Sequence, residues 1–309
     1  MSGSSRQEIR VGVLMYTYDR VDDARVNMEI IRNVWSKVPL LKDVVVVHAY
    51  NGNQDWWPEA YLENTLCRTD NPGHFSGAEL LLNTGIQVFK EKYPDITHVV
   101  VLASDTWCVK PEYIQNVIQE MVSKELYLAT NAWGSKKDTN MFKIGMALDL
   151  FILDMDFVKK SEFFPLNYKS FGDKYGELLM YRGTFAFLER VFALRFKQAL
   201  MRIAPIPSEN LIEKVALAHL YHMREREPVH YEQKAFFKKP IGKRHMYWPK
   251  IGLLTHHDPV EKRRALKEYR LSLGEHGRRF LEARDFKYFN QGKNKTTFVK
   301  GAKTIDYND

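Results

Sequence analysis

The segment THVVVLASDTW, residues 97–107, begins as a short apolar run and ends on a serine and an aspartate. A brief run of valine and leucine predicts a strand that is buried on both faces of a sheet, as in α/β proteins. Such proteins bind ligands at the carboxyl ends of their strands, so Asp105 is the first candidate for chemistry. An Asp followed by Thr and, at 111, by Pro also suits an ordinary strand exit before a helix. The segment by itself leaves both interpretations open.

Apolar runs and helical periodicity alternate on both sides of this segment. This alternation predicts an α/β fold with a mainly parallel sheet flanked by helices on both faces. The carboxyl-terminal portion is predicted to be more helical. One of the helices expected there is capped by Ser208. Strands are expected at 9–15, 44–48, 98–102, 126–130 and 145–154, and helices at 22–38, 76–89, 111–122, 176–203 and 209–223.

The composition is that of a folded protein with a substantial core. The chain has 309 residues, of which 45% are hydrophobic. No run approaches the length of a membrane span, and the first ten residues do not have the pattern of a secretory signal, so a cytoplasmic location is expected. Cys67 and Cys108 lack metal-type spacing and are expected to be free thiols.

Positive charge is concentrated near the carboxyl end. The net charge is +8, yet residues 234–303 contain 19 Lys and Arg against 6 Asp and Glu. Such a segment favours phosphate-bearing partners, namely a nucleotide, the anionic inner face of a membrane or nucleic acid. A solvated helix face is the alternative. No recognition helix or RNA-binding motif is visible, so no nucleic-acid partner is expected.

Three motifs, taken in their order, resemble the GT-A fold nucleotide-sugar-dependent glycosyltransferases, and glycosyltransferase family 2 above all. YTYDR at 16–20 stands directly after the first predicted strand, where the family typically has Pro-Thr-Tyr-Asn-Arg. The segment 71–86 is similar to the glycine-containing loop and the helix that follows it in the family. Residues 103–105 stand where the family has Asp-x-Asp, of which this chain keeps only the last Asp. The resemblance implies transfer of a sugar from a nucleoside diphosphate-sugar donor to a hydroxyl of a carbohydrate or lipid-linked acceptor.

The resemblance also implies where the donor lies. Gly73 and Gly77 would permit close approach of the backbone, and the start of a helix offers N–H groups to an anion. Lys243 is a candidate for neutralising the diphosphate leaving group. The acidic residue that usually follows the second strand in the family is absent from this chain, which has VHAYN at 47–51. The residues implied to contact the donor are Thr17, Tyr18, Asp19, Arg20, Gly73, Gly77, Ser104 and Lys243.

A divalent ion, Mn²⁺ or Mg²⁺, is the cofactor that the resemblance implies. Asp105 would bind it together with His256 or His257, which follow a strand-like run at 253–255. One carboxylate with diphosphate oxygens and water is able to hold a hard cation, and neutral imidazole suits Mn²⁺. Ala103, in place of the first Asp of the motif, is the main departure from the family.

Glu209 is the candidate catalytic base, because it begins a predicted helix at about the distance from Asp105 where the family has an acidic pair. It would deprotonate the acceptor hydroxyl. An acidic residue in the first turn of a helix is equally expected from the helix dipole. Glu177, Glu189 and Glu213 are alternatives to it. Trp107, Trp133 and Tyr181 are candidates for stacking against a sugar.

One catalytic domain is expected at 8–260, with a nucleotide-binding half at about 8–130 and an acceptor half at about 131–260. A basic helical extension and tail would follow at 261–309. Two other functions stay open. A nucleotidyltransferase of sugar-nucleotide synthesis usually has a glycine-rich loop after the first strand, and residues 16–20 contain no glycine. A catalytically degenerate scaffold would bind carbohydrate or a membrane through the basic end.

Overall fold

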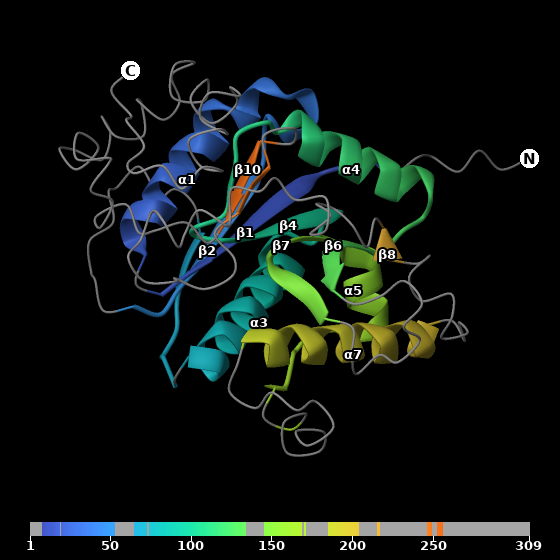
Figure 1. Ribbon diagram of the computed structural model, residues 1–309. Coiled ribbons are helices and arrows are strands. Elements are labelled where there is room, and N and C mark those ends of the chain that lie inside the picture. The colour runs from blue at the N-terminus through green and yellow to red at the C-terminus, as the bar shows by residue number, and fades with distance from the viewer. Residues whose placement is uncertain are drawn as a thin grey trace, which may run out of the picture.

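The computed structural model describes residues 8–18, 20–52, 65–72, 74–133, 145–168, 170, 185–203, 215–216, 246–248 and 252–255. Its main feature is a seven-stranded sheet in the order β3-β2-β1-β4-β7-β6-β8 (Figure 1). β7 runs antiparallel to its neighbours β4 and β6, whereas the other neighbouring pairs are parallel. The strands are β1 (Val11–Thr17), β2 (Val45–Tyr50), β3 (Thr65–Arg68), β4 (His98–Ala103), β6 (Leu128–Trp133), β7 (Gly145–Asp154) and β8 (Val215–Ala216).

Helices cover both faces of this sheet (Figure 1). The helices α1 (Val21–Asn33) and α4 (Glu112–Ser123) pack on one face, and two 3-10 turns, Trp35–Lys37 and Pro39–Leu41, follow α1. The other face is covered by α3 (His74–Lys92), α5 (Met155–Ser161) and α7 (Phe185–Ile203). The predicted α/β class, with a mainly parallel sheet between helices, is confirmed.

Side-chain alternation explains the two layers. In β1, Val13 and Met15 point into the core beneath α1 and α4, and Leu14 points into the core beneath α3. Two glycines bring α3 close to β1. A Cβ at Gly12 would lie 2.8 Å from the ring carbon Cζ of Phe89, and a Cβ at Gly85 would lie 2.8 Å from Leu14 Cδ2. The packing of α3 therefore depends on the missing side chains at these two positions.

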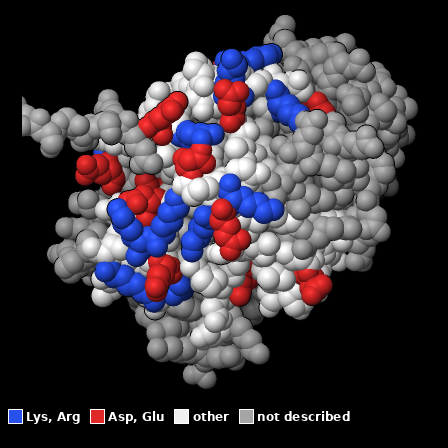
Figure 2. All heavy atoms as spheres, turned by 180° about the vertical axis from the view of Figure 1, so that it is seen from behind, with Lys and Arg blue, Asp and Glu red and all other residues white. Residues whose placement is uncertain are grey.

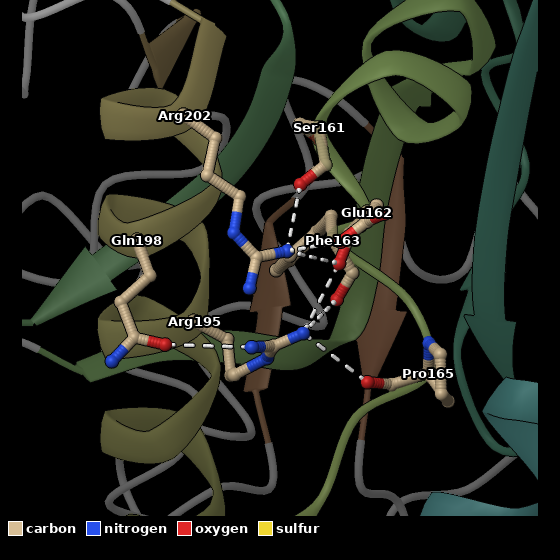
Figure 3. Close-up of polar contacts among 7 residues, drawn as sticks. All are labelled: Ser161, Glu162, Phe163, Pro165, Arg195, Gln198 and Arg202. Atoms are coloured by element: carbon tan, nitrogen blue, oxygen red, sulfur yellow. Dashed lines mark hydrogen bonds and ion pairs between the residues drawn. The ribbon is translucent and has the colours of Figure 1, made fainter.

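Two arginines of α7 bind the end of α5 (Figure 3). Arg195 Nη2 donates to the carbonyl oxygens of Glu162, Phe163 and Pro165 at 3.1–3.3 Å. Arg202 Nη1 donates to the carbonyl oxygen of Ser161 at 3.3 Å and to the Glu162 carboxylate at 2.9 Å. Carbonyls at the end of a helix lack partners within it, so these arginines donate to acceptors at the end of α5 and in the segment that follows it. Burial lowers the pKa of Arg195 from its ordinary value. These contacts fix α7 relative to the sheet.

A second, three-stranded sheet has the order β5-β10-β9. It consists of β5 (Trp107–Cys108), β9 (Met246–Trp248) and β10 (Leu253–Thr255). The strand-like run expected at 253–255 is confirmed, and it pairs antiparallel with β5.

The helix predicted at 209–223 is wrong at Val215 and Ala216. These two residues form β8, which pairs in parallel with β6 at Leu128 and Ala129. The pairing supplies backbone hydrogen bonds at the edge of a sheet, and this tertiary contact overrides a local helical pattern. Neither β3 nor β5 was expected, because strands of two to four residues are too short to show a periodicity.

The two cysteines are free thiols, as expected, with Cys108 buried and Cys67 half-buried. Of the helices that the structure describes, none combines the length and the apolar character needed to cross a bilayer.

Candidate functional site

Polar residues gather at the carboxyl ends of β1, β2 and β4. The strand order reverses here, because the chain moves from β1 outward to β3 and then returns to place β4 on the other side of β1. Open α/β sheets bind ligands outside the carboxyl ends of their strands at such a switch point. The buried polar or charged residues in this region are Thr17, Asp23, Asn27, His48, Asn51, Ser104, Asp105 and Thr106.

Arg20 joins the two strands that flank the switch point. It stands at the amino-terminal cap of α1, and its Nη1 atom forms an ion pair with Asp105 Oδ2, in the turn after β4. Arg20 Nε donates to Asp23 Oδ2 at 3.0 Å, from the first turn of α1. The side chains of Arg20, Asp23 and Asp105 are 19%, 0% and 10% exposed. The three groups form a largely buried cluster with a formal charge of −1.

Thr17 ends β1 and is buried. Its hydroxyl oxygen lies 2.8 Å from Nε2 of His48, on the adjacent strand β2. Burial lowers the pKa of His48 to about 3, so this imidazole is neutral at pH 7. Tyr18 follows Thr17 and is 46% exposed. A Cβ at Gly52 would meet the carbonyl oxygen of Tyr18, so the chain segments after β1 and β2 lie in close contact.

The turn after β4 is held by its neighbours. Ser104 N donates to the Tyr16 carbonyl at 3.1 Å, and Thr106 N donates to the Ala103 carbonyl at 2.9 Å. The indole N–H of Trp107 lies 3.2 Å from the carbonyl oxygens of both Asp23 and Ser104. Trp107 is 1% exposed, so the expectation that it stacks against a sugar is wrong. Its ring packs in the core, and its one polar group ties the turn to α1.

Asn51 and Gly77 bring the end of β2 to the start of α3. Asn51 Nδ2 donates to the Gly77 carbonyl at 3.2 Å. Asn51 is 6% exposed, and its Oδ1 atom has no hydrogen-bond partner among the described residues. A Cβ at Gly77 would lie 2.6 Å from Asn71 Oδ1 and 3.0 Å from Asn51 Nδ2. A buried amide oxygen without a donor costs stability unless a bound group supplies one.

Acidic groups also act on Tyr16, whose side chain packs on the α3 and α7 side of the sheet. The Tyr16 hydroxyl donates to the Leu148 carbonyl at 3.0 Å. Burial raises the pKa of Tyr16 well above its ordinary value, and the charges of Asp149, Asp105 and Glu189 raise it further. Asp149 and Glu189 are 3% and 2% exposed. The three carboxylates therefore lie within electrostatic range of one phenol at this edge of the sheet.

An irregularity in β7 positions Asp149. Thr130 of β6 pairs with Phe151, whereas Ala132, two residues further, pairs with Met146. The extra residues of β7 lie between these two pairs and include Asp149. Such bulges re-aim side chains, often beside functional sites.

The structure therefore brings together Thr17, Tyr18, Arg20, Gly77, Ser104 and Asp105 of the predicted set. Other predicted positions lie outside the described residues, and so do the extension and tail expected at 261–309. These positions are Asp19, Gly73, Glu209, Lys243, His256 and His257.

Asp23, His48 and Asn51 were missed as part of the site. Asp23 follows Arg20 at the i,i+3 spacing of a helical ion pair, which was a usable signal. Asp149 was also missed, although a carboxylate in the middle of the apolar run of 145–154 is unusual. Glu189 had been named as an alternative base.

The described residues alone do not form a metal site. Within the described ranges, no three His, Cys, Asp or Glu side chains lie close enough together to bind an ion. One backbone feature is relevant to the expected ligands. Leu254 pairs with Trp107, so Thr255, the residue before His256, lies on the Asp105 side of that pair.

Charges are mixed on the face of the molecule that lies behind the view of Figure 1. In Figure 2, acidic and basic side chains alternate over the described surface. Ion pairs on the described surface include Lys160 with Asp156 and Lys124 with Glu120. The described part of this face therefore offers no patch of a single sign to a phosphate-rich partner.

Comparisons with known proteins gave only structural likenesses. No family model matches the chain, and no curated protein does. The chain is similar to the crystal structure of S. aureus TarS 1–349, at 10% identity and a TM-score of 0.40, over 63% of this chain and 56% of that one. It spans 30% of a longer TarS structure.

A second likeness is to the galactosyltransferase LgtC in complex with donor and acceptor sugar analogues. The identity is 8% and the TM-score 0.37, over 59% of this chain and 70% of that one. A third is to A197 from STIV, at 7% identity and a TM-score of 0.28. Values this low establish no shared activity, so the function is argued from the site itself.

Proposed function

We propose that this protein is a glycosyltransferase that moves a sugar from a nucleoside diphosphate-sugar to an acceptor hydroxyl. One observation carries the proposal. Three motifs that resemble those of one enzyme family, and that are separated by tens of residues, converge at one edge of the sheet. Arg20 of the first motif binds Asp105 of the third, and Gly77 of the second contacts Asn51 beside them.

The donor diphosphate would lie at the switch point between β1 and β4. Arg20 provides a guanidinium fixed by two carboxylates, and a guanidinium binds phosphate oxygens in a planar, two-pronged geometry. Gly77 lies in the first turn of α3, where free backbone N–H groups favour an anion. The buried Asn51 Oδ1 is an acceptor for an N–H group of the donor.

A divalent ion, Mn²⁺ or Mg²⁺, belongs to this proposal. Two features support it. Asp105 already holds a cationic partner. The last residue of β10, Thr255, lies on the Asp105 side of the pairing with β5, and His256 and His257 follow it in the sequence. Asp105 with one of these imidazoles would hold the ion. Its contribution would be to neutralise charge that develops on the diphosphate leaving group.

Deprotonation of the acceptor requires a carboxylate base. Glu209 stays the candidate from the sequence, and it lies outside the described residues. Glu189 has support of its own, because it is buried and its charge raises the pKa of Tyr16, as the charge of Asp105 does. The base is assigned by comparing Glu209→Gln and Glu189→Gln, as developed below.

The test is turnover of UDP-, GDP-, CDP- and dTDP-linked sugars, with Mn²⁺, with Mg²⁺ and with a chelator. We expect hydrolysis or transfer of at least one donor, and its loss in Asp105→Asn. Asp95→Asn is the matched control. Asp95 also pairs with an arginine, Arg10, but the pair is half-exposed and lies at the amino ends of β1 and β4, away from the candidate site.

Two results would reject the proposal. The first is full activity in Asp105→Asn. The second is the absence of binding for every donor of the panel, which would favour the degenerate scaffold. Release of pyrophosphate from a nucleoside triphosphate and a sugar phosphate would favour the nucleotidyltransferase.

A further inference from the structure

We propose that the hydroxyl of Tyr168, together with the carboxylate of Glu189, binds a hydroxyl group of the acceptor sugar. The inference rests on the proposed function and deepens it, because it takes the ligand at this place to be the acceptor of the transfer. Tyr168 is 3% exposed, and its hydroxyl has no hydrogen-bond partner among the described residues. A buried hydroxyl without a partner costs stability, and a ligand that bonds to it removes this cost.

The backbone that carries Tyr168 is fixed to α3. Asn83 Nδ2 donates to the Leu166 carbonyl at 3.0 Å, and Leu166 N donates to Asn83 Oδ1 at 2.7 Å. Two residues further, Tyr168 N donates to Glu79 Oε2 at 2.6 Å. Glu79 lies in the second turn of α3. The phenol is therefore held in place before a ligand arrives, which lowers the entropic cost of binding one.

The phenol of Tyr168 belongs to the polar cluster around Tyr16. Both side chains pack in the layer beneath α3 and α7. Burial raises the pKa of Tyr168 well above its ordinary value, and the charges of Glu79 and Glu189 raise it further. The pKa of Tyr16 responds in the same way to burial and to Asp149, and also to Tyr168 and Glu189. The two phenols and Glu189 therefore lie within electrostatic range of one another.

This cluster reaches the surface at two of its members. Tyr16 and Glu79 are half-buried, whereas Tyr168 and Glu189 are buried. A ligand would enter beside the two half-buried side chains. Tyr16 stands near the carboxyl end of β1, one residue before Thr17. The place proposed for the acceptor thus adjoins the switch point at which the donor is proposed to lie.

The groups present suit an alcohol. A carboxylate accepts hydrogen bonds, a phenol is able to donate one, and an alcohol does both. An alcohol that donates to Glu189 and accepts from Tyr168 bonds to both groups through one oxygen. A phosphate is disfavoured, because it would face the carboxylates of Glu79 and Glu189. The hydroxyl held against Glu189 is the one that a base at this position would deprotonate, which identifies it with the acceptor.

The test compares the unaltered protein with Tyr168→Phe, which removes only the hydroxyl. The probes are glucose, galactose, mannose and N-acetylglucosamine, each titrated without nucleotide and followed by saturation-transfer NMR. We expect at least one to bind, and its Kd to rise at least about tenfold in Tyr168→Phe through loss of one hydrogen bond.

Tyr127→Phe is the matched control. Tyr127 packs in the same layer and stacks on Phe157, with 4.9 Å between the ring centroids. It directly precedes β6, away from the carboxyl ends of β1 and β4. Loss of its hydroxyl should leave the Kd of every probe unchanged.

Urea unfolding without any ligand gives a second readout. The Tyr168 hydroxyl has no partner in the free protein, so its removal should not lower the urea midpoint. A lower midpoint in Tyr168→Phe would show that the hydroxyl already has a partner, and it would overturn the inference. The same measurement confirms that the variant folds.

Two binding results would also overturn the inference. The first is the absence of binding by every probe, or an equal Kd in Tyr168→Phe and the unaltered protein. The second is weaker binding of the nucleotide sugars in Tyr168→Phe with unchanged binding of the monosaccharides, because the hydroxyl would then belong to the donor.

The outcome is separable from that of the donor assay. The monosaccharide and urea measurements contain no nucleotide and do not depend on turnover. Failure of the inference shows as an unchanged Kd for the sugars or a lower urea midpoint. Failure of the proposed function shows as absent turnover across the donor panel.

Discussion

Acidification should destabilise this protein through the neutral imidazole of His48. This side chain is 4% exposed on β2 and binds the Thr17 hydroxyl behind the candidate site. Burial lowers its pKa from 6.5 to about 3 in the folded protein. Between these two values the unfolded chain binds a proton that the folded protein does not. The free energy of unfolding therefore rises with pH across this window. The contribution of His48 to it is lost as the pH falls from 6.5 toward 3.

The size of the effect follows from the unfolded state. At pH 5 the protonated form of an imidazole with a pKa of 6.5 exceeds the neutral form about 30-fold. This protonation lowers the free energy of unfolding by about 2 kcal/mol. The folded protein binds almost no proton at His48 at that pH, because its pKa of about 3 lies about two units below pH 5. At pH 8 the effect is negligible. One buried histidine thus lowers the free energy of unfolding by about 2 kcal/mol between pH 8 and pH 5.

The assay is urea unfolding of the unaltered protein and of His48→Gln, each at pH 8 and at pH 5. We expect the fall in unfolding free energy from pH 8 to pH 5 to be smaller in His48→Gln by about 2 kcal/mol. The weakened contact with Thr17 affects the variant at both pH values, so it cancels in this comparison. His98→Gln should behave alike, because burial lowers the pKa of His98 to about 4.

Equal falls in both proteins would refute the reasoning. They would mean that His48 binds its proton in the folded state as readily as in the unfolded chain. The imidazole would then be solvated, contrary to its position behind Thr17.

Three further predictions concern packing and catalysis. Gly12→Ala should lower the free energy of unfolding by about 1–3 kcal/mol in urea, because the new Cβ presses on the rigid ring of Phe89, and unchanged stability would contradict that packing. Arg195→Met should lower the free energy of unfolding in urea by about 1–3 kcal/mol, since it removes the charged donor that three carbonyls share. Arg202→Met, at a half-exposed side chain, should lower it less. If Glu189 is the base, Glu189→Gln should lower kcat by at least about 100-fold and remove the acidic limb of the pH–rate profile. Glu209→Gln is the comparison, and an unaltered profile in Glu189→Gln would exclude Glu189 as the base.

Much of the fold follows from local pattern. The runs at 98–102 and 145–154 correspond to β4 and β7, and the periodicities at 76–89 and 111–122 to α3 and α4, within a few residues. The periodicity at 22–38 corresponds to α1, which ends earlier, at Asn33, before a 3-10 turn at Trp35–Lys37. Periodicity is a property of neighbouring residues, so these elements are visible without a partner. The edge strand at Val215–Ala216 is not, because its conformation comes from pairing with β6.

The sequence by itself determined the longer strands and helices, the α/β class, and polar residues that end the strands, since each depends on residues close together in the chain. Only the tertiary structure decided that Arg20 is the partner of Asp105, 85 residues away, and that Asp149 and Glu189 lie buried beside Tyr16. The physical reason is that a charge is stabilised by whatever lies near it in space. Which groups those are depends on strand order and on the irregular pairing of β7, and neither leaves a local signal.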